Sequence, residues 1–138
     1  MPSWSSIRTL SRRRWALLFR AALVLAVVRA VLWAFPFGRA RGCIDRLTRR
    51  PVLVGECRAD VAWAVSAAAR RLLGTRCLAR ALALHALLRQ AGIPSELRIG
   101  VSRMQAGLLA HAWVECDGVA LADGVDSTQY QALPSLAR

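Results

Sequence analysis

Three residue types that together support nucleophilic catalysis occur in the second half of the chain. Cys77 opens a segment with the pattern of a helix, His111 lies in a strand-like run, and Asp123 follows the next turn. A thiolate can attack a carbonyl carbon, an imidazole can carry the proton, and a carboxylate can hold the imidazole in one tautomer. These types in this order predict an acyl-transfer enzyme with a cysteine nucleophile.

The predicted place of Cys77 at a helix start suits this chemistry. The positive end of the helix dipole and the first-turn N–H groups favour the thiolate form of a cysteine there. The backbone N–H of Cys77 is also a natural donor to an oxyanion, whereas the sequence does not identify a second donor. His111 would pair with the thiolate and later protonate the leaving amine, and Asp123 would orient the imidazole.

Each of these residues also has a purely structural interpretation. Cys77 could be a small buried helix residue, His111 a polar residue on an exposed strand face, and Asp123 a turn acid. His85 is a second candidate base, but it lies within the apolar stripe of its helix, where histidines are usually structural. A zinc site of Cys77, His85 and His111 matches no usual ligand spacing.

The elements that must position these residues follow from the spacing of the apolar side chains. One helix is predicted from about Asp60, its first-turn acid, to Leu73, and a second from Cys77 to Gln90 with Thr75 as a candidate cap. Alternating apolar residues then predict a strand over 96–101. Two more strands are predicted over 108–116 and 119–123, on either side of the Asp117-Gly118 turn. Helices followed by an antiparallel sheet define an α+β fold, in which N-terminal helices pack on a small sheet.

The last hairpin decides whether Asp123 can reach His111. A three-residue loop, 116–118, would place the two residues opposite each other, with Cβ atoms about 4.5–5.5 Å apart. A two-residue loop would put Asp123 on the other face of the sheet. We therefore predict the three-residue register or another odd-length equivalent. Residues 103–107 are expected to form a loop, and a short helix is expected near Tyr130.

Length and cysteine content bound the class of protein. The chain has 138 residues, which is the size of one domain and is enough to bury a core without disulfides. Its cysteines show neither a disulfide framework nor the paired spacing of a metal site: Cys43, Cys57, Cys77 and Cys116. A reducing cytosol fits best, with a Cys43–Cys57 disulfide as an alternative.

Positive charge is concentrated in the first half of the chain. Residues 1–76 hold 15 arginines and three acids, residues 77–138 hold five of each, and the net charge of the whole chain is +12. Such a field can face an acidic peptide, an acidic partner protein or an anionic lipid surface. We expect no nucleic-acid role, because no recognition motif, lysine-rich tract or aromatic platform accompanies the charge.

Residues 15–37 are mostly apolar and long enough to cross a bilayer. Arg20 and Arg29 interrupt them, and an arginine at mid-bilayer costs about 2.5–3.5 kcal/mol on insertion scales. We favour a buried or interfacial helix pair within the domain over a membrane span or a signal peptide. Residues 39–55 are interpreted as a basic connector. The expected location is the cytoplasm, with membrane association left open.

Three segments resemble one known family. They are Cys77-Leu-Ala-Arg-Ala81 with Gly92-Ile-Pro94 behind it, Leu97-Arg-Ile-Gly-Val101, and His111-Ala-Trp-Val-Glu115. In this order they are similar to the transglutaminase-like cysteine proteases of lasso-peptide biosynthesis, which are stand-alone leader peptidases. The resemblance covers roughly residues 58–134 and implies a transglutaminase-like, papain-like core.

The resemblance also implies domains, roles and partners. It implies a catalytic core over residues 58–138 behind a basic, apolar helical region over 1–57. The family's nucleophile, base and orienting acid match Cys77, His111 and Asp123, with Asp117 as the rival acid. The implied activity is removal of the leader from a ribosomally made precursor, with no cofactor or metal. The implied partners are that precursor, a leader-binding recognition protein and a lasso cyclase. A transglutaminase-type transfer to an amine and a non-catalytic, membrane-associated scaffold are the alternatives.

Overall fold

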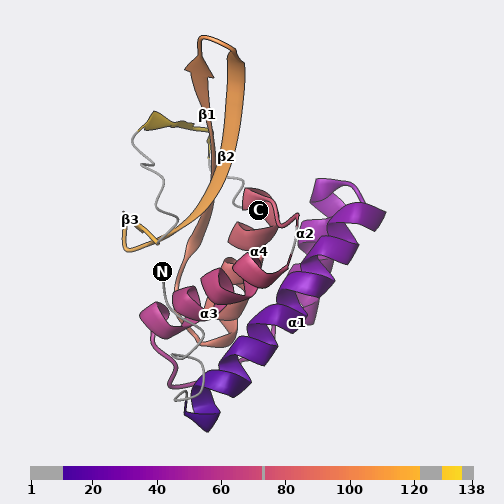
Figure 1. Cartoon of the computed structure of the whole chain (residues 1–138), viewed down its shortest axis with the longest axis vertical. Helices are drawn as coiled ribbons and strands as arrows, with labels where there is room; N and C mark the ends of the chain where they lie inside the picture. Colours follow the sequence, from indigo (N-terminus) through magenta and orange to yellow (C-terminus); the bar gives the residue numbers. More distant parts are fainter. Residues whose placement is uncertain (1–10, 73, 122–128, 135–138) are drawn as a thin grey trace.

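The computed structural model describes residues 11–72, 74–121 and 129–134 (Figure 1). Within them, helices come first and an antiparallel sheet follows, so the predicted α+β fold is confirmed. The helices are α1 (Arg12–Ala34), α2 (Phe37–Leu47), α3 (Arg58–Arg71) and α4 (Cys77–Gln90). The strands are β1 (Glu96–Met104), β2 (Gly107–Cys116), β3 (Val119–Ala120) and β4 (Gln131–Ala132).

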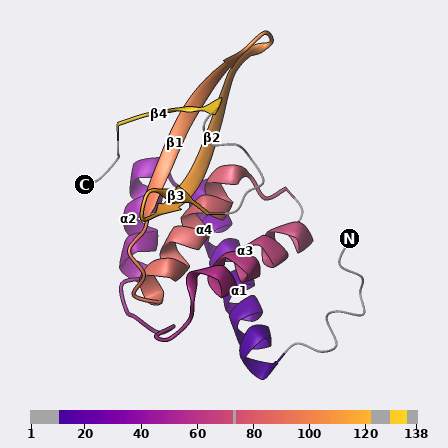
Figure 2. The ribbon, with the colours of Figure 1, turned by 90° about the vertical axis from the view of Figure 1, so that its left-hand side faces the viewer.

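The sheet is built around one long hairpin. Its strands lie in the order β3-β2-β1-β4, and β1 pairs with β2 from Glu96 opposite Glu115 to Met104 opposite Gly107. The tip of this hairpin extends well beyond the helices (Figures 1 and 2). The loop predicted over 103–107 is therefore mostly strand, because the pairing of β1 with β2 continues to Met104 opposite Gly107. Next to Tyr130, Gln129 is 3₁₀-helical, which agrees with the short helix predicted there, and β4 follows.

Helix α4 lies at the centre of the hydrophobic core. It contacts α1, α2, α3, β1 and β2, and Figure 2 shows it between the sheet and α1. Its predicted bounds, Cys77 to Gln90, are confirmed, and Leu87 and Leu88 within it are completely buried. Leucines and alanines at successive positions let the helix pack on several sides at once.

The first two helices correct the sequence interpretation in one respect. Pro36 ends α1, since Phe35 is extended before it, and then serves as the N-cap of α2. Much of the stretch interpreted as a connector is therefore helix, with Ala40 and Ile44 buried on one side. The residues between Ala40 and Ile44 include Arg41 and Gly42, so the helical spacing of the buried side chains was not recognised in the sequence.

Helix α1 is long and apolar enough to cross a membrane by length and composition, with a mean hydropathy of 2.1 over an 18-residue window. Such a helix alone is weak evidence for a span, because core helices and signal sequences share these properties. In this structure α1 packs along α3 and α4 through one face, which includes Leu17, Ala21 and Leu25. The helix is compatible with either a soluble or a membrane-associated protein.

The turn between β2 and β3 shows that the predicted hairpin register is wrong. Cys116 pairs with Val119 and Glu115 with Ala120, so the loop has two residues. Asp117 has φ 52° and Gly118 φ 76°, and two positive φ values are what a type I′ turn requires. Asp-Gly is the preferred dipeptide for that turn, which explains why it prevails over the longer loop. Asp123 itself lies outside the described residues.

Candidate active site

Cys77 is the first residue of α4, where the sequence placed it. Its N-cap is Arg76, with φ −83° and ψ 157°, and the Arg76 side chain provides no capping hydrogen bond. Thr75 is not the cap; its hydroxyl donates to the carbonyl oxygen of Leu72 at 2.8 Å. Since no N-cap side chain occupies them, the first-turn N–H groups of α4 can meet an oxygen of a bound group. The Cys77 side chain is half-buried.

His111 lies in the middle of β2 within an aromatic cluster, which we define as His111, Trp113 and Tyr130. Its ring centroid is 6.1 Å from that of Trp113 with the rings nearly parallel, and 5.2 Å from that of Tyr130. Gly100 makes this packing possible: a Cβ there would lie 2.7 Å from Trp113 Cη2. The cluster fixes the plane in which the imidazole lies.

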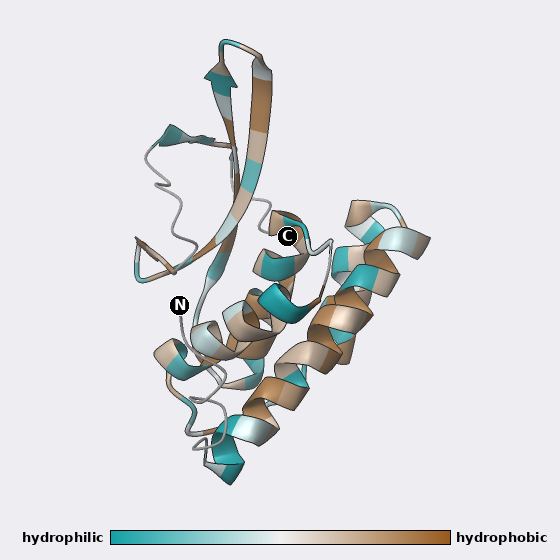
Figure 3. Cartoon of the chain, viewed as in Figure 1, coloured by the Kyte–Doolittle hydropathy of each residue, from teal (hydrophilic) through white to brown (hydrophobic). Residues whose placement is uncertain are grey.

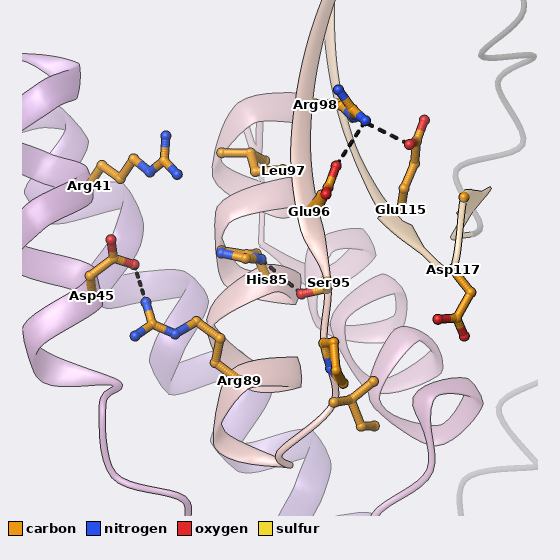
Figure 4. A pocket seen from close by; sticks show the side chains of 13 residues that line it. Arg41, Asp45, His85, Arg89, Ser95, Glu96, Leu97, Arg98, Glu115 and Asp117 are labelled. Atoms are coloured by element: carbon orange, nitrogen blue, oxygen red, sulfur yellow. Dashed lines mark hydrogen bonds and ion pairs between the residues drawn. The ribbon is translucent and has the colours of Figure 1, made fainter. Parts of the chain in front are cut away.

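A chain of polar contacts holds Trp113 in turn. Its Nε1 donates to Glu115 Oε1 at 2.9 Å, and Arg98 Nε donates to Glu115 Oε2 at 3.3 Å. Arg98 also forms an ion pair with Glu96 at 2.8 Å (Figure 4). The sequence analysis missed these supporting roles. The sequence did contain a signal for them: His111, Trp113 and Glu115 are alternate residues of a predicted strand, so their side chains share one face.

The two faces of β2 have different surroundings. Ala112, Val114 and Cys116 belong to the core that the helices form, whereas His111 and Trp113 lie on the other face. The helix that carries Cys77 packs against the strand that carries His111, so the structure brings these two elements together. Direct pairing of the thiol with the imidazole, and the role of Asp123, stay predictions.

The rival base His85 lies in a different environment. Its Nδ1 is 2.8 Å from the hydroxyl of Ser95, at a cavity of about 920 Å³ that α2, α4 and β1 line (Figure 4). Burial lowers the pKa of His85, with Asp45 opposing this and Arg89 and Arg41 reinforcing it. His85 lies eight residues after Cys77, or about 12 Å along the helix axis. It is therefore poorly placed to take the proton of that thiol.

The other cysteines differ from Cys77 in their surroundings. All four are free, so the alternative Cys43–Cys57 disulfide is absent. The thiol of Cys57 lies 3.1 Å from Asp60 Oδ2, and burial raises the pKa of Cys116. Among the described residues, no group of three or more His, Cys, Asp or Glu comes together as a metal site.

The fold and this arrangement agree with a comparison against protein families. A model of the transglutaminase-like superfamily matches residues 22–135, from within α1 to beyond β4. The match covers most of the chain, which therefore belongs to the transglutaminase-like superfamily. Members of this superfamily are typically cysteine proteases or acyltransferases. No curated protein and no solved structure matches the chain.

Proposed function

We propose that the chain is a cysteine peptidase that removes the leader from a ribosomally synthesised lasso-peptide precursor. The observation that carries the proposal is the superfamily match, within which Cys77 begins α4 and His111 lies on the strand that α4 covers. The resemblance of 77–81, 92–94 and 111–115 to the leader peptidases of that pathway supports the choice of substrate.

In the first half-reaction the Cys77 thiolate attacks the carbonyl carbon of the scissile peptide bond. A C–S bond forms, and the electron pair of the carbonyl moves to its oxygen, which accepts a hydrogen bond from the backbone N–H of Cys77. When this intermediate collapses, the C–N bond breaks and the His111 imidazolium protonates the leaving amine. The core peptide departs with a free N-terminal amine, and the leader stays on Cys77 as a thioester.

Water completes the second half-reaction. His111 takes a proton from the water as it attacks the thioester, the C–S bond breaks, and the leader leaves with a new carboxylate. The two-residue turn does not set Asp123 directly opposite His111, so Asp123 would have to reach the imidazole from beyond the end of β3 in order to hold it in one tautomer. Ala112 and Val114 occupy the face of β2 that packs on the helices, so the approach of the sulfur to His111 stays a prediction.

The proposed partners follow from the substrate. The precursor is presented by a separate leader-binding recognition protein, and a lasso cyclase then closes the freed amine onto an acidic side chain of the core. The arginines of the first half are the candidate docking surface for the presenting protein or the leader. Reversing the charges of Arg49 and Arg50, both exposed, should weaken complex formation, and unchanged binding would count against this docking surface.

The deciding experiment measures masses. The purified chain is incubated with a lasso-peptide precursor and its leader-binding protein, and hydrolysis should yield the leader, with its new carboxylate, and the core. In parallel, a glutamine peptide and a primary amine are supplied, because transglutaminase-type transfer would join them with loss of ammonia. If the glutamine peptide and the amine are joined but the leader is not cleaved, the chain is an acyltransferase and not a peptidase. If neither product forms, the scaffold role is the function that remains.

The chain offers matched controls for the base and the acid. His111→Gln should abolish cleavage, whereas His85→Gln should retain it, since His85 lies at a cavity that neither Cys77 nor His111 lines. Asp123→Asn should reduce cleavage strongly, whereas Asp117→Asn should not. Asp117 is 87% exposed in the turn, and asparagine also tolerates its positive φ. If both variants of a pair lose cleavage activity equally, the role of base would no longer be specific to His111, or the role of orienting acid to Asp123.

A further inference from the structure

The outward face of α1 is entirely apolar. Every exposed residue of the helix from position 15 to 34 is alanine, valine, leucine, phenylalanine or tryptophan. We define this outer face as Trp15, Ala16, Phe19, Leu23, Ala26, Val27, Ala30, Trp33 and Ala34. Phe19 is 71% exposed, Leu23 65% and Trp33 90%. Figure 3 shows the helix as a largely apolar rod on the outside of the bundle.

The opposite face of α1 is already occupied. Leu17, Leu18, Ala21, Leu25 and Val28 are buried where the helix packs along α3 and α4. A helix that is apolar on all sides is normally surrounded by protein or by lipid. Among the described residues, protein covers only one side of α1, so the outer face is a continuous apolar surface with a place for a partner.

The two arginines within this helix are turned away from the outer face. Arg20 is half-buried, and its Nε donates to Gln90 Oε1 of α4 at 3.1 Å. The guanidinium of Arg29 lies 3.6 Å from where a Cβ on Gly74 would be, at the approach to α4. Both charges therefore lie beside the protein body, and the outer face can enter an apolar medium without them.

Positive charge surrounds the ends of the outer face. The three acids of residues 1–76 form ion pairs with arginines: Glu56 with Arg13, Asp60 with Arg14, and Asp45 with Arg89. Most of the 15 arginines of residues 1–76 remain to make this half positive, and Arg12 and Arg39 are exposed beyond the two ends of the outer face.

Tryptophans stand near both ends of the outer face. Trp15 and Trp33 are about 27 Å apart along the helix axis. Tryptophan prefers the boundary between lipid headgroups and acyl chains, and arginine is attracted to anionic headgroups.

We propose that α1 docks in the plane of an anionic lipid surface through its outer face. An in-plane position fits better than a span, because a spanning helix would have to leave α3 and α4 and uncover their apolar side chains. A second protein is a poorer fit, since the outer face carries no polar group that would fix an orientation. This inference does not depend on the peptidase reaction.

Vesicle flotation of the full chain tests the proposal. The chain should float with vesicles of phosphatidylglycerol and phosphatidylethanolamine, at least ten-fold less with pure phosphatidylcholine, and less as salt rises. Phe19→Glu with Leu23→Glu should reduce flotation at least ten-fold. The control variant, Leu108→Glu with Val119→Glu, also replaces two exposed apolar residues, 73% and 62% exposed, and should float normally.

A second measurement distinguishes docking on a lipid surface from binding of a second copy of the chain and from a membrane span. Emission of Trp33 should shift to the blue and be quenched by lipids brominated near the headgroup when anionic vesicles are added, and Trp33→Phe should lose that component. A chain that stays in solution with anionic vesicles overturns the proposal. So does a dimer that only the Phe19, Leu23 variant dissociates. A tryptophan introduced near the middle of α1 as Leu23→Trp should also be quenched near the headgroup, and its quenching by bromines at the bilayer centre would indicate a span and overturn the proposal.

Discussion

Helices α1 and α4 have similar apolar composition but opposite places in the molecule. Nine of the 14 residues of α4 are buried, and its sides are covered by other helices and by the sheet. Five of the 23 residues of α1 are buried, and its outer face is bare. The difference shows that an apolar helix acquires its role from what covers it, and not from composition alone.

The two helices therefore use apolar side chains for different ends. In α4 they hold the helix start in a fixed position, which is what a nucleophile needs if it is to meet its base and its substrate. In α1 one row of apolar residues stabilises the fold, and the other row is free to bind. Substitutions should accordingly affect catalysis and stability in α4, but mainly binding on the outer face of α1.

The largest expected effect concerns the first residue of α4. Cys77→Ala should lower kcat/KM for leader cleavage by about 10³-fold or more, because no other group of the site can form the thioester. Cys43→Ala on α2 is the matched control and should stay close to wild type. Rates are measured by mass spectrometry with circular dichroism as the check on folding. Retained function in Cys77→Ala would leave the chain with only a scaffold role.

Two leucines of α1 sharpen the contrast between a covered and an uncovered face. Leu25 is fully buried, whereas Leu23, two residues earlier, is 65% exposed. Leu25→Ala should lower the free energy of unfolding by about 2–5 kcal/mol, and Leu23→Ala by about 0.5 kcal/mol or less. Urea denaturation of both variants measures the difference. Similar losses would mean that the outer face is covered by the protein itself in solution.

Much of this fold could be predicted from the sequence because local signals were strong. The period of apolar residues and the Ala91-Gly92 stop defined α4, and the alternation over 96–101 defined β1. Helix α2 was missed because basic residues interrupt its apolar positions. The turn at Asp117 and Gly118 was assigned the wrong length, because a functional argument about Asp123 was given more weight than the strong type I′ preference of Asp-Gly.

The surroundings of the candidate site were less predictable than its residues. Cys77 and His111 could be named from residue type and predicted element. The aromatic cluster could not, because Tyr130 reaches it from just before β4, a strand that pairs with the far side of β1. Such contacts depend on long-range strand order, which local patterns do not encode. The structure also reveals that His111 and the helical core lie on opposite faces of β2.

Gly100 tests whether the aromatic cluster is packed as tightly as the core around α4. Gly100→Ala would put a Cβ within 2.8 Å of Trp113 Cζ3 and at 3.0 Å from Tyr130 Cβ. We expect a loss of about 1–3 kcal/mol in the free energy of unfolding from overpacking. Gly42→Ala in α2 meets nothing within 4 Å and should instead gain about 0.5–1 kcal/mol. Equal stability of the two variants would mean that Trp113 moves aside freely.

The smallest expected effect is a dependence of the folding stability on pH, which arises because His85 of α4 is largely buried. Burial lowers the pKa of His85 below its ordinary value of 6.5, so the unfolded chain takes up the proton first as pH falls. The stability that neutral His85 contributes is fully present above about pH 6.5 and is lost as pH falls through the lower folded pKa.

His85→Gln isolates this contribution, because glutamine can still reach the hydroxyl of Ser95 but does not titrate. Urea denaturation between pH 7.5 and about 5 should show wild type losing stability faster than the variant on acidification. Every other titrating group is common to both chains and cancels in the difference. Parallel curves would mean that solvent reaches His85 through the cavity that Arg41, Asp45 and Arg89 line, and α4 would then be less enclosed at this position than its buried neighbours indicate.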